Sequence, residues 1–276
     1  MKPAPFAYHR ATSIDDAIAQ LSAGDALVRA LAGGQSLVPM LNLRLAPVDK
    51  LVDLTRIDAL RQAGENPDSI RYGALLTHAA FEDRRVPDAS NGLMPFIGAQ
   101  IAYRAVRNRG TIGGAIALAD PAADWLTTVI ALEARIVLVG PGGRRTLDST
   151  DFAIGPYMTV LGDAELIEAI EVPRRPSTER WGHSKMARKT GEYAESMAIA
   201  LIDKTQRKAR LVIGATDGTP LVLEKSAREI ADGNLGDGLA AVIRDELAAS
   251  GRDFAASKIL LHSTAALRAV KKAGTP

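Results

Sequence analysis

Two double-glycine segments, each placed between short ordered stretches, constrain the fold of this chain most. In the first, an apolar run leads into Gly33-Gly34, and the spacing predicts a helix start at Ser36. In the second, Gly113-Gly114 follow Thr111. Glycine has no side chain, so backbone N–H groups can approach a phosphate, and a following helix adds partial positive charge. One such segment is usually only a turn. Two that each carry a hydroxyl better fit a diphosphate held from both sides.

Several classes of function are disfavoured by the sequence. Neither glycine segment has the G-x-G-x-x-G spacing of a nicotinamide-binding Rossmann domain or the G-x-x-x-x-G-K-[ST] spacing of a P-loop. The charge is balanced, with 34 Lys and Arg against 32 Asp and Glu, which argues against a nucleic-acid or membrane-surface partner. No uncharged apolar stretch approaches the roughly 18 residues that a membrane-spanning helix needs.

The chain contains no cysteine. Thiolate metal sites, iron–sulfur clusters, disulfides and cysteine nucleophiles are therefore excluded within it. The four histidines show no metal-ligand spacing, so we expect no bound metal. The first ten residues lack the apolar core of a signal peptide, which makes the cytoplasm the expected location.

Periodicity and capping signals divide the chain into three small units of mixed helix and strand, an α+β organisation. The units are residues 1–56, 57–176 and 177–276, with 173–177 as the linker before the third. Predicted helices span residues 12–21 (capped by Ser13), 36–43, 77–84, 93–106 and 121–132. Predicted strands span residues 26–31, 51–54, 70–74, 134–139, 144–147, 165–172, 196–203 and 208–215. The rest of the third unit is predicted to be helical.

Four segments, taken together, resemble one known family. They are Ala32-Gly33-Gly34-Gln35-Ser36-Leu37-Val38-Pro39, Thr111-Ile112-Gly113-Gly114, Asp120-Pro121-Ala122-Ala123-Asp124 and Lys185-Met186-Ala187-Arg188-Lys189-Thr190-Gly191-Glu192-Tyr193-Ala194. In order and spacing they are similar to the FAD-binding medium subunit of molybdenum hydroxylases, the family of carbon monoxide dehydrogenase and xanthine dehydrogenase. The resemblance covers nearly the whole chain.

The resemblance implies a three-domain FAD-binding fold of the vanillyl-alcohol-oxidase or PCMH type. Residues 1–56 and 57–176 would be the two FAD-binding subdomains, with FAD between them, and 177–276 would form a C-terminal domain of sheet and helices. The implied cofactor-binding residues are Arg29, Leu31, Ala32, Gly33, Gly34, Gln35, Ser36, Leu37, Ile101, Thr111, Ile112, Gly113, Gly114, Ala115, Asp120, Asp124, Leu161, Lys185 and Tyr193. No residue of the chain is implied to be catalytic.

The resemblance also implies roles for these residues. Both glycine loops would cradle the pyrophosphate with backbone donors, and Asp124 would accept hydrogen bonds from flavin hydroxyls. Ile101 and Leu161 would line the apolar surroundings of the cofactor. Lys185 would lie near the isoalloxazine and stabilise the anionic reduced ring, which raises its potential, and Tyr193 would lie against the ring.

Simpler structural interpretations stand beside these roles. Tyr193 could be a tyrosine at the edge of the core, Asp124 a first-turn helix carboxylate and Lys185 a surface lysine. The chain also departs from the family pattern at two positions, where Ala115 replaces the usual Asn or Ser and Leu118 replaces a His. Ala115 forfeits a side-chain hydrogen bond near the phosphates, worth roughly 1 kcal/mol.

The function implied is that of an electron-transfer flavin subunit. A large molybdenum–pterin subunit would oxidise the substrate, a small subunit would relay electrons through two [2Fe–2S] clusters to FAD, and an external acceptor would take them. The absence of cysteine agrees with clusters carried by a partner. The expected assembly is a heterotrimer or a doubled heterohexamer, and the substrate would be set by the large subunit. Two alternatives remain open: a self-sufficient flavin oxidoreductase, and a non-redox nucleotide-binding module.

Overall fold

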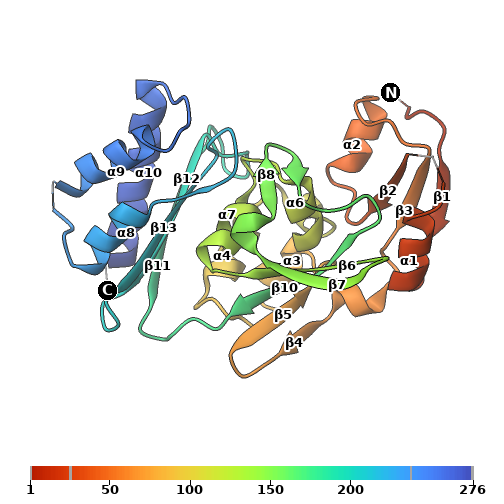
Figure 1. The fold of residues 1–276 in the computed structure, drawn as a ribbon, viewed down its shortest axis with the longest axis horizontal. Coiled ribbons are helices and arrows are strands. Elements are labelled where there is room, and N and C mark those ends of the chain that lie inside the picture. The colour runs from red at the N-terminus through yellow and green to blue at the C-terminus, as the bar shows by residue number, and fades with distance from the viewer. Residues whose placement is uncertain (1, 25–26, 237, 275–276) are drawn as a thin grey trace.

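Three larger β-sheets follow one another along the molecule in the computed structural model, which describes residues 2–24, 27–236 and 238–274 (Figure 1). The first sheet lies at the N-terminal end, the second in the middle and the third at the C-terminal end, where three helices cover one face. Each sheet falls within one of the three units expected from the sequence, and the α+β organisation is confirmed. The exact unit boundaries stay a prediction.

The first sheet is a small parallel sheet of order β1-β3-β2. Its strands are β1 (Ala7–Arg10), β2 (Val28–Leu31) and β3 (Lys50–Asp53), and its helices are α1 (Ile14–Leu21) and α2 (Leu37–Asn42). Ser13 caps α1 by accepting a hydrogen bond from the Asp16 backbone N–H at 3.0 Å. The first double glycine lies in the turn between β2 and α2, so the parallel crossover positions this loop at one end of the sheet.

The middle unit is built on an antiparallel sheet of order β4-β5-β10-β6-β7. The strands are β4 (Ala63–Glu65), β5 (Ser69–Gly73), β6 (Arg135–Gly140), β7 (Gly143–Asp148) and β10 (Leu166–Pro173), with β8 (Ala153–Gly155) and β9 (Met158–Thr159) as a separate pair. The helices are α3 (His78–Glu82), α4 (Leu93–Gln100), α5 (Arg104–Arg107), α6 (Ile112–Leu118) and α7 (Asp124–Ala131), with two short 3₁₀ turns at Asp58–Arg61 and Ser149–Asp151. The sheet and the helices enclose a core in which Tyr72, Phe81 and Trp125 are among the largest side chains.

The third sheet is antiparallel, in the order β11-β12-β13-β14. Its elements are β11 (Arg180–Met186), β12 (Ser196–Asp203), β13 (Lys208–Gly214), β14 (Leu221–Val222), α8 (Glu224–Ala231), α9 (Gly238–Ala248) and α10 (Ala256–Gly274). Strand β12 is buried along its whole length because it has a core on each face. Ala198 and Ala200 face the helical layer, whereas Ile199 and Leu201 belong to the core of the middle unit. This shared core fixes the third sheet against the cleft-forming part of the molecule.

Local structure departs from the sequence-based expectations at two segments, and two further elements were not predicted. The predicted helix over 93–106 is broken, because Ala102 takes a φ of 45° and the Arg107 guanidinium donates to the Ile101 and Ala102 carbonyls at 3.1 and 2.8 Å. Residues 180–186 form a strand and not a helix, held by pairing with β12. The second glycine segment opens helix α6, with Thr111 as its N-cap. Strand β1 was not predicted, and it pairs with the distant β3.

The strand predicted before the first glycine loop and the predicted linker are both observed in part. The predicted strand over 26–31 is observed as Val28–Leu31, and its first residue lies outside the described residues. The predicted linker 173–177 does connect β10 to β11. It is tethered to the middle unit, however, because the Arg175 backbone N–H donates to the Ala89 carbonyl at 2.8 Å and its side chain pairs with Glu179.

Candidate functional site

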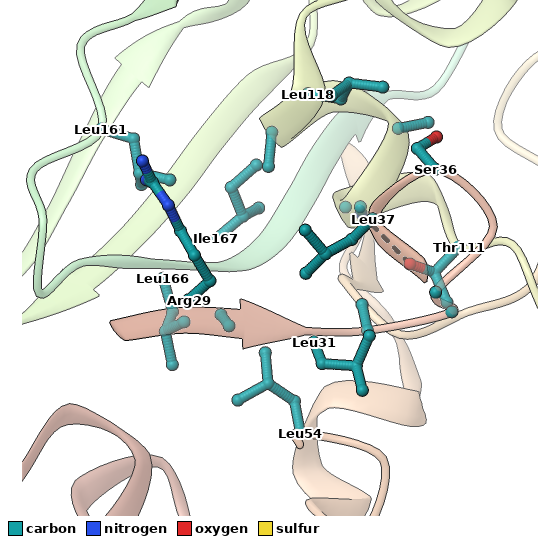
Figure 2. Close-up of a pocket in the computed structure, with 18 of the residues that line it drawn as sticks. Arg29, Leu31, Ser36, Leu37, Leu54, Thr111, Leu118, Leu161, Leu166 and Ile167 are labelled. Carbon is teal, nitrogen blue, oxygen red and sulfur yellow. Dashed lines mark hydrogen bonds between the residues drawn. The ribbon is translucent and has the colours of Figure 1, made fainter. Parts of the chain in front are cut away.

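A cavity of about 750 Å³, called here the first cavity, lies between the N-terminal sheet and the middle unit. Strand β2 and the first glycine loop form one wall, and the start of α6 and the segment around Leu161 form the other (Figure 2). Most of the labelled residues that line it are apolar, among them Leu31, Leu54 and Leu166. A deep, largely apolar cleft with few polar groups is typical of a cofactor site.

A second cavity of about 590 Å³ adjoins the first. It lies between α6, α7 and the segment that carries Tyr193, and Asp124 and Tyr193 are in its lining. Five residues line both cavities: Gln35, Ser36, His78, Ala115 and Leu118. We call these five residues the junction. The two cavities therefore make one two-part cleft, suited to an elongated ligand with two separate head groups.

The two glycine segments meet at backbone contact distance beside the junction. A Cβ built on Gly33 would lie 2.1 Å from the carbonyl oxygen of Arg109, so no other residue fits there without a shift of the backbone. A Cβ on Gly113 would lie 2.5 Å from the Cβ of Ala74. Gly34 has a φ of +74°, which favours glycine on conformational grounds as well. Glycine at position 33 therefore lets the first loop close on the segment before Thr111, and glycine at position 113 lets the start of α6 pack against Ala74.

The loops differ in the backbone donors that they leave free. No hydrogen bond is made by the N–H groups of Gly33, Gly34, Gln35 or Ser36 to any residue that the structure describes. In the second loop the donors are already used. Ile112 and Gly113 donate to the carbonyls of Leu76 and Ala74, and Gly114 and Ala115 donate to the Thr111 hydroxyl and carbonyl.

Backbone donors were expected from both loops, and the structure offers free ones from the first alone. The physical reason is the helix that begins at Thr111, since its first turn and the neighbouring strand consume the N–H groups of the second loop. The second loop instead contributes shape and the Thr111 hydroxyl. Unpaired donors that face a cavity are costly unless water or a ligand satisfies them, and anionic oxygens suit them best.

A buried ion pair stands behind the second cavity. Lys185 Nζ, on β11, lies 2.9 Å from each carboxylate oxygen of Asp124 in the first turn of α7. Burial raises the pKa of Asp124 above its ordinary value, and the charge of Lys185 acts in the opposite direction. Asp124 lines the cavity and Lys185 does not, so the carboxylate is the member of the pair that a ligand would meet.

The site residues expected from the sequence are distributed over both cavities. In the first cavity lie Arg29, Leu31, Ala32, Gly33, Gly34, Gln35, Ser36, Leu37, Thr111, Gly113, Gly114, Ala115 and Leu161. In the second lie Gln35, Ser36, Ile101, Ala115, Asp120, Asp124 and Tyr193. Ile112 lines neither cavity because its side chain is buried in the core, and Lys185 reaches the cleft only through Asp124. Tyr193 is 61% exposed at the edge of the second cavity.

Sequence reasoning missed several residues of the lining. They include His78 at the junction, Tyr157 and Met158 beside the first cavity, and Arg188 at the second. His78 follows Thr77, the first residue of the helix predicted over 77–84, so its position was visible although its role was not. Of the others, Met158 lies in the two-residue strand β9, and Tyr157 and Arg188 lie outside helices and strands, so none has a periodic signal. Within the described ranges we find neither a helix long and apolar enough to span a membrane nor a group of three acidic or histidine side chains arranged to hold a metal.

A two-part cleft with free backbone donors beside its junction defines this chain as a dinucleotide-binding protein. The residues present fit such a cofactor, because the loop over 33–36, with glycine at its two constrained positions, leaves its backbone N–H groups open to a diphosphate. Residues 4–175 match the protein family described as the FAD binding domain in molybdopterin dehydrogenase. The chain therefore belongs to the FAD-binding subunits of molybdenum hydroxylases, as its sequence motifs predicted, and is a flavoprotein oxidoreductase component.

Individual relatives agree with this assignment. The chain is 35% identical over 226 residues to the carbon monoxide dehydrogenase medium chain of Hydrogenophaga pseudoflava, covering 82% of this chain and 79% of that protein. It is 33% identical over 221 residues to the nicotine 6-hydroxylase medium subunit of Paenarthrobacter nicotinovorans, covering 79% and 77%. A solved structure of reconstituted CO dehydrogenase from Oligotropha carboxidovorans contains a chain that superposes with a TM-score of 0.91 at 30% identity, covering 99% of each.

Proposed function

We propose that this chain holds FAD in the two-part cleft and acts as the electron-transfer subunit of a molybdenum-containing hydroxylase or dehydrogenase. It would receive electrons from [2Fe–2S] clusters of a small partner subunit, supplied by a large molybdenum–pterin subunit, and deliver them through bound FAD to an external acceptor. The observation that carries the proposal is the junction, because an FAD molecule has to pass from one cavity to the other there. The absence of cysteine supports clusters held elsewhere.

Each part of the cleft has a task in this proposal. The free N–H groups of residues 33–36 would hold the diphosphate without a buried cation. The apolar lining around Leu161 would exclude water, and Asp124 would accept hydrogen bonds from the cofactor, as the sequence suggested. Tyr193 is exposed at the edge of the second cavity, where it can cover a ring system.

The test is to purify the tagged chain from its own cells and to count cofactors. We expect one FAD per copy of the chain, with molybdenum and iron in co-purifying subunits. Separation of the chain from those subunits should leave FAD bound, while reduction by the substrate of the complex disappears and chemical reduction by dithionite persists. Such a result would mean that electrons from the substrate reach the FAD only through the partner subunits.

Two results would contradict the proposal. Turnover of an organic substrate by the isolated chain would favour a self-sufficient flavin oxidoreductase. A colourless chain that binds ADP but takes up no FAD would favour a non-redox nucleotide-binding module. The identity of the substrate and of the electron acceptor would follow from assays of the intact complex.

A further inference from the structure

His78 is held in one protonation state by a hydrogen bond to Trp125. The indole Nε1–H of Trp125 lies 2.9 Å from Nδ1 of His78, and both side chains are buried. An indole nitrogen can only donate, so Nδ1 has to be the acceptor. An imidazolium has no acceptor nitrogen, which excludes the charged ring. The neutral ring then carries its proton on Nε2, and His78 is a hydrogen-bond donor there.

Burial acts in the same direction as this hydrogen bond. Desolvation, together with the positive charge of Arg107, lowers the pKa of His78 to about 4. His78 therefore stays neutral at physiological pH. The ring packs on the second glycine segment, where a Cβ on Gly110 would lie 2.6 Å from Nε2. The backbone N–H of His78 also donates to the Gly110 carbonyl at 2.9 Å.

The Nε2 donor has no partner among the residues that the structure describes. It also differs from Nε2 of His183 and of His262, which are fully enclosed without a hydrogen bond. His78 is one of the five junction residues, and so it faces the space where the two cavities join. The hydrogen bond from buried Trp125 thus leaves the Nε2–H of His78 as an unpaired donor at the junction.

We infer that His78 donates a hydrogen bond from Nε2 to an oxygen of the diphosphate–ribityl segment of FAD, at the point where the cofactor crosses between the cavities. The inference rests on the proposed function, since it needs a ligand that spans both cavities. Trp125 is the positioning residue, because it selects the tautomer that donates. The first glycine loop and His78 then hold the middle of the cofactor from two directions.

The test measures FAD affinity of the full chain, freed of cofactor, by titration of flavin fluorescence. His78→Phe keeps the ring but removes the donor, and we expect its Kd for FAD to rise about tenfold or more. His78→Gln places an amide donor near the position of Nε2 and should restore most of the affinity. His262→Phe is the matched control, because it changes a buried histidine that lines neither cavity. It should leave the Kd for FAD unchanged.

A measurement on the unmodified chain keeps the inference testable if a variant does not fold. Long-range ¹H–¹⁵N spectra should show His78 as the Nε2–H tautomer without ligand, and its Nε2 resonance should move when FAD saturates the cleft. An Nδ1–H tautomer, an unmoved resonance, or a His78→Phe variant that binds FAD within twofold of wild type would overturn the inference. Failure of the unmodified chain to bind FAD would instead overturn the proposed function.

Discussion

Lys185 and Asp124 form a buried ion pair that ties the third sheet to the first turn of α7. Their side chains are only 10% and 6% exposed, and Lys185 Nζ lies 2.9 Å from both carboxylate oxygens. Removal of one member of such a pair leaves the other charge buried without a partner, which costs more than the pair itself contributes. The pair therefore stabilises the wall of the second cavity and keeps the Asp124 carboxylate charged there.

Replacement of Lys185 by Met should destabilise the chain by about 3–5 kcal/mol at neutral pH, because Asp124 loses its partner. The double variant Lys185→Met/Asp124→Asn carries no buried charge and should recover part of that loss. Urea unfolding of the cofactor-free chain measures both. A double variant less stable than Lys185→Met alone would contradict the explanation.

The same variant should show a distinctive pH dependence. Burial raises the folded pKa of Asp124, and loss of Lys185 removes the main force that opposes this rise. A raised folded pKa means that the native state binds the proton more tightly than the unfolded chain does. Its stability is then retained in acid and lost as pH rises through the raised pKa. The deficit of Lys185→Met against wild type should shrink between pH 7 and about pH 4.

The flavin midpoint potential tests the remaining role that the sequence suggested for Lys185. If its charge stabilises the anionic reduced ring, the potential of FAD bound to Lys185→Met should fall below that of wild type. Asp124 separates the ammonium from the cavity in the structure. A potential equal to that of wild type would therefore assign Lys185 to stabilising Asp124 only.

Gly33 should be intolerant of even the smallest side chain. In Gly33→Ala the new Cβ would lie 2.1 Å from the Arg109 carbonyl oxygen, so the two glycine loops have to separate. We expect the Kd for FAD to rise by at least tenfold, since the free donors of the first loop move with it. Gly142→Ala is the matched control, because its Cβ would meet nothing within 4 Å. Equal FAD affinities for the two variants would show that loop contact is not required.

Much of the fold was visible in local sequence signals. Ser13 caps α1 as predicted, and the strands predicted over 134–139 and 144–147 are observed as β6 and β7, which pair with each other. Features set by distant contacts were not visible. The break after Gln100 depends on the Arg107 guanidinium, and β11 exists as a strand because β12 pairs with it over its whole length. Periodicity alone cannot report such partners.

The site shows the same division between local and distant information. The glycine loops were found because their spacing is local, but the closeness of Gly33 to Arg109 joins residues far apart in the chain. The resemblance supplied Asp124 and Lys185 as separate cofactor contacts, whereas the structure pairs them with each other. His78 was overlooked because its tautomer, and so its ability to donate from Nε2, depends on a hydrogen bond from Trp125, 47 residues away.

Acid should destabilise the chain partly through His183. Burial, together with the charges of Lys185 and Lys272, lowers the pKa of His183 to about 3. A lowered folded pKa means that the unfolded chain binds the proton more readily, so stability is present above about pH 6.5 and is lost as pH falls below it. We expect a loss of roughly 1.4 kcal/mol per pH unit between about pH 6 and 4 from this residue. His183→Leu should reduce the acid slope of the unfolding free energy by that amount, and an unchanged slope would contradict a buried neutral histidine.

Ala115 offers a route to tighter cofactor binding. It is a junction residue that lines both cavities, and its methyl group makes no hydrogen bond where the family usually carries Asn or Ser. Ala115→Ser adds one hydroxyl, and a neutral hydrogen bond of about 1 kcal/mol corresponds to about a fivefold lower Kd for FAD. Ala248→Ser, on the exposed face of α9, serves as the matched control because it repeats the substitution in a helix far from both cavities. Flavin fluorescence titration of the two variants compares them directly. An Ala115→Ser variant with unchanged or weaker affinity would mean that no cofactor oxygen lies within reach of this position, and that the free donors of the first loop, together with His78, hold the crossing segment without help from α6.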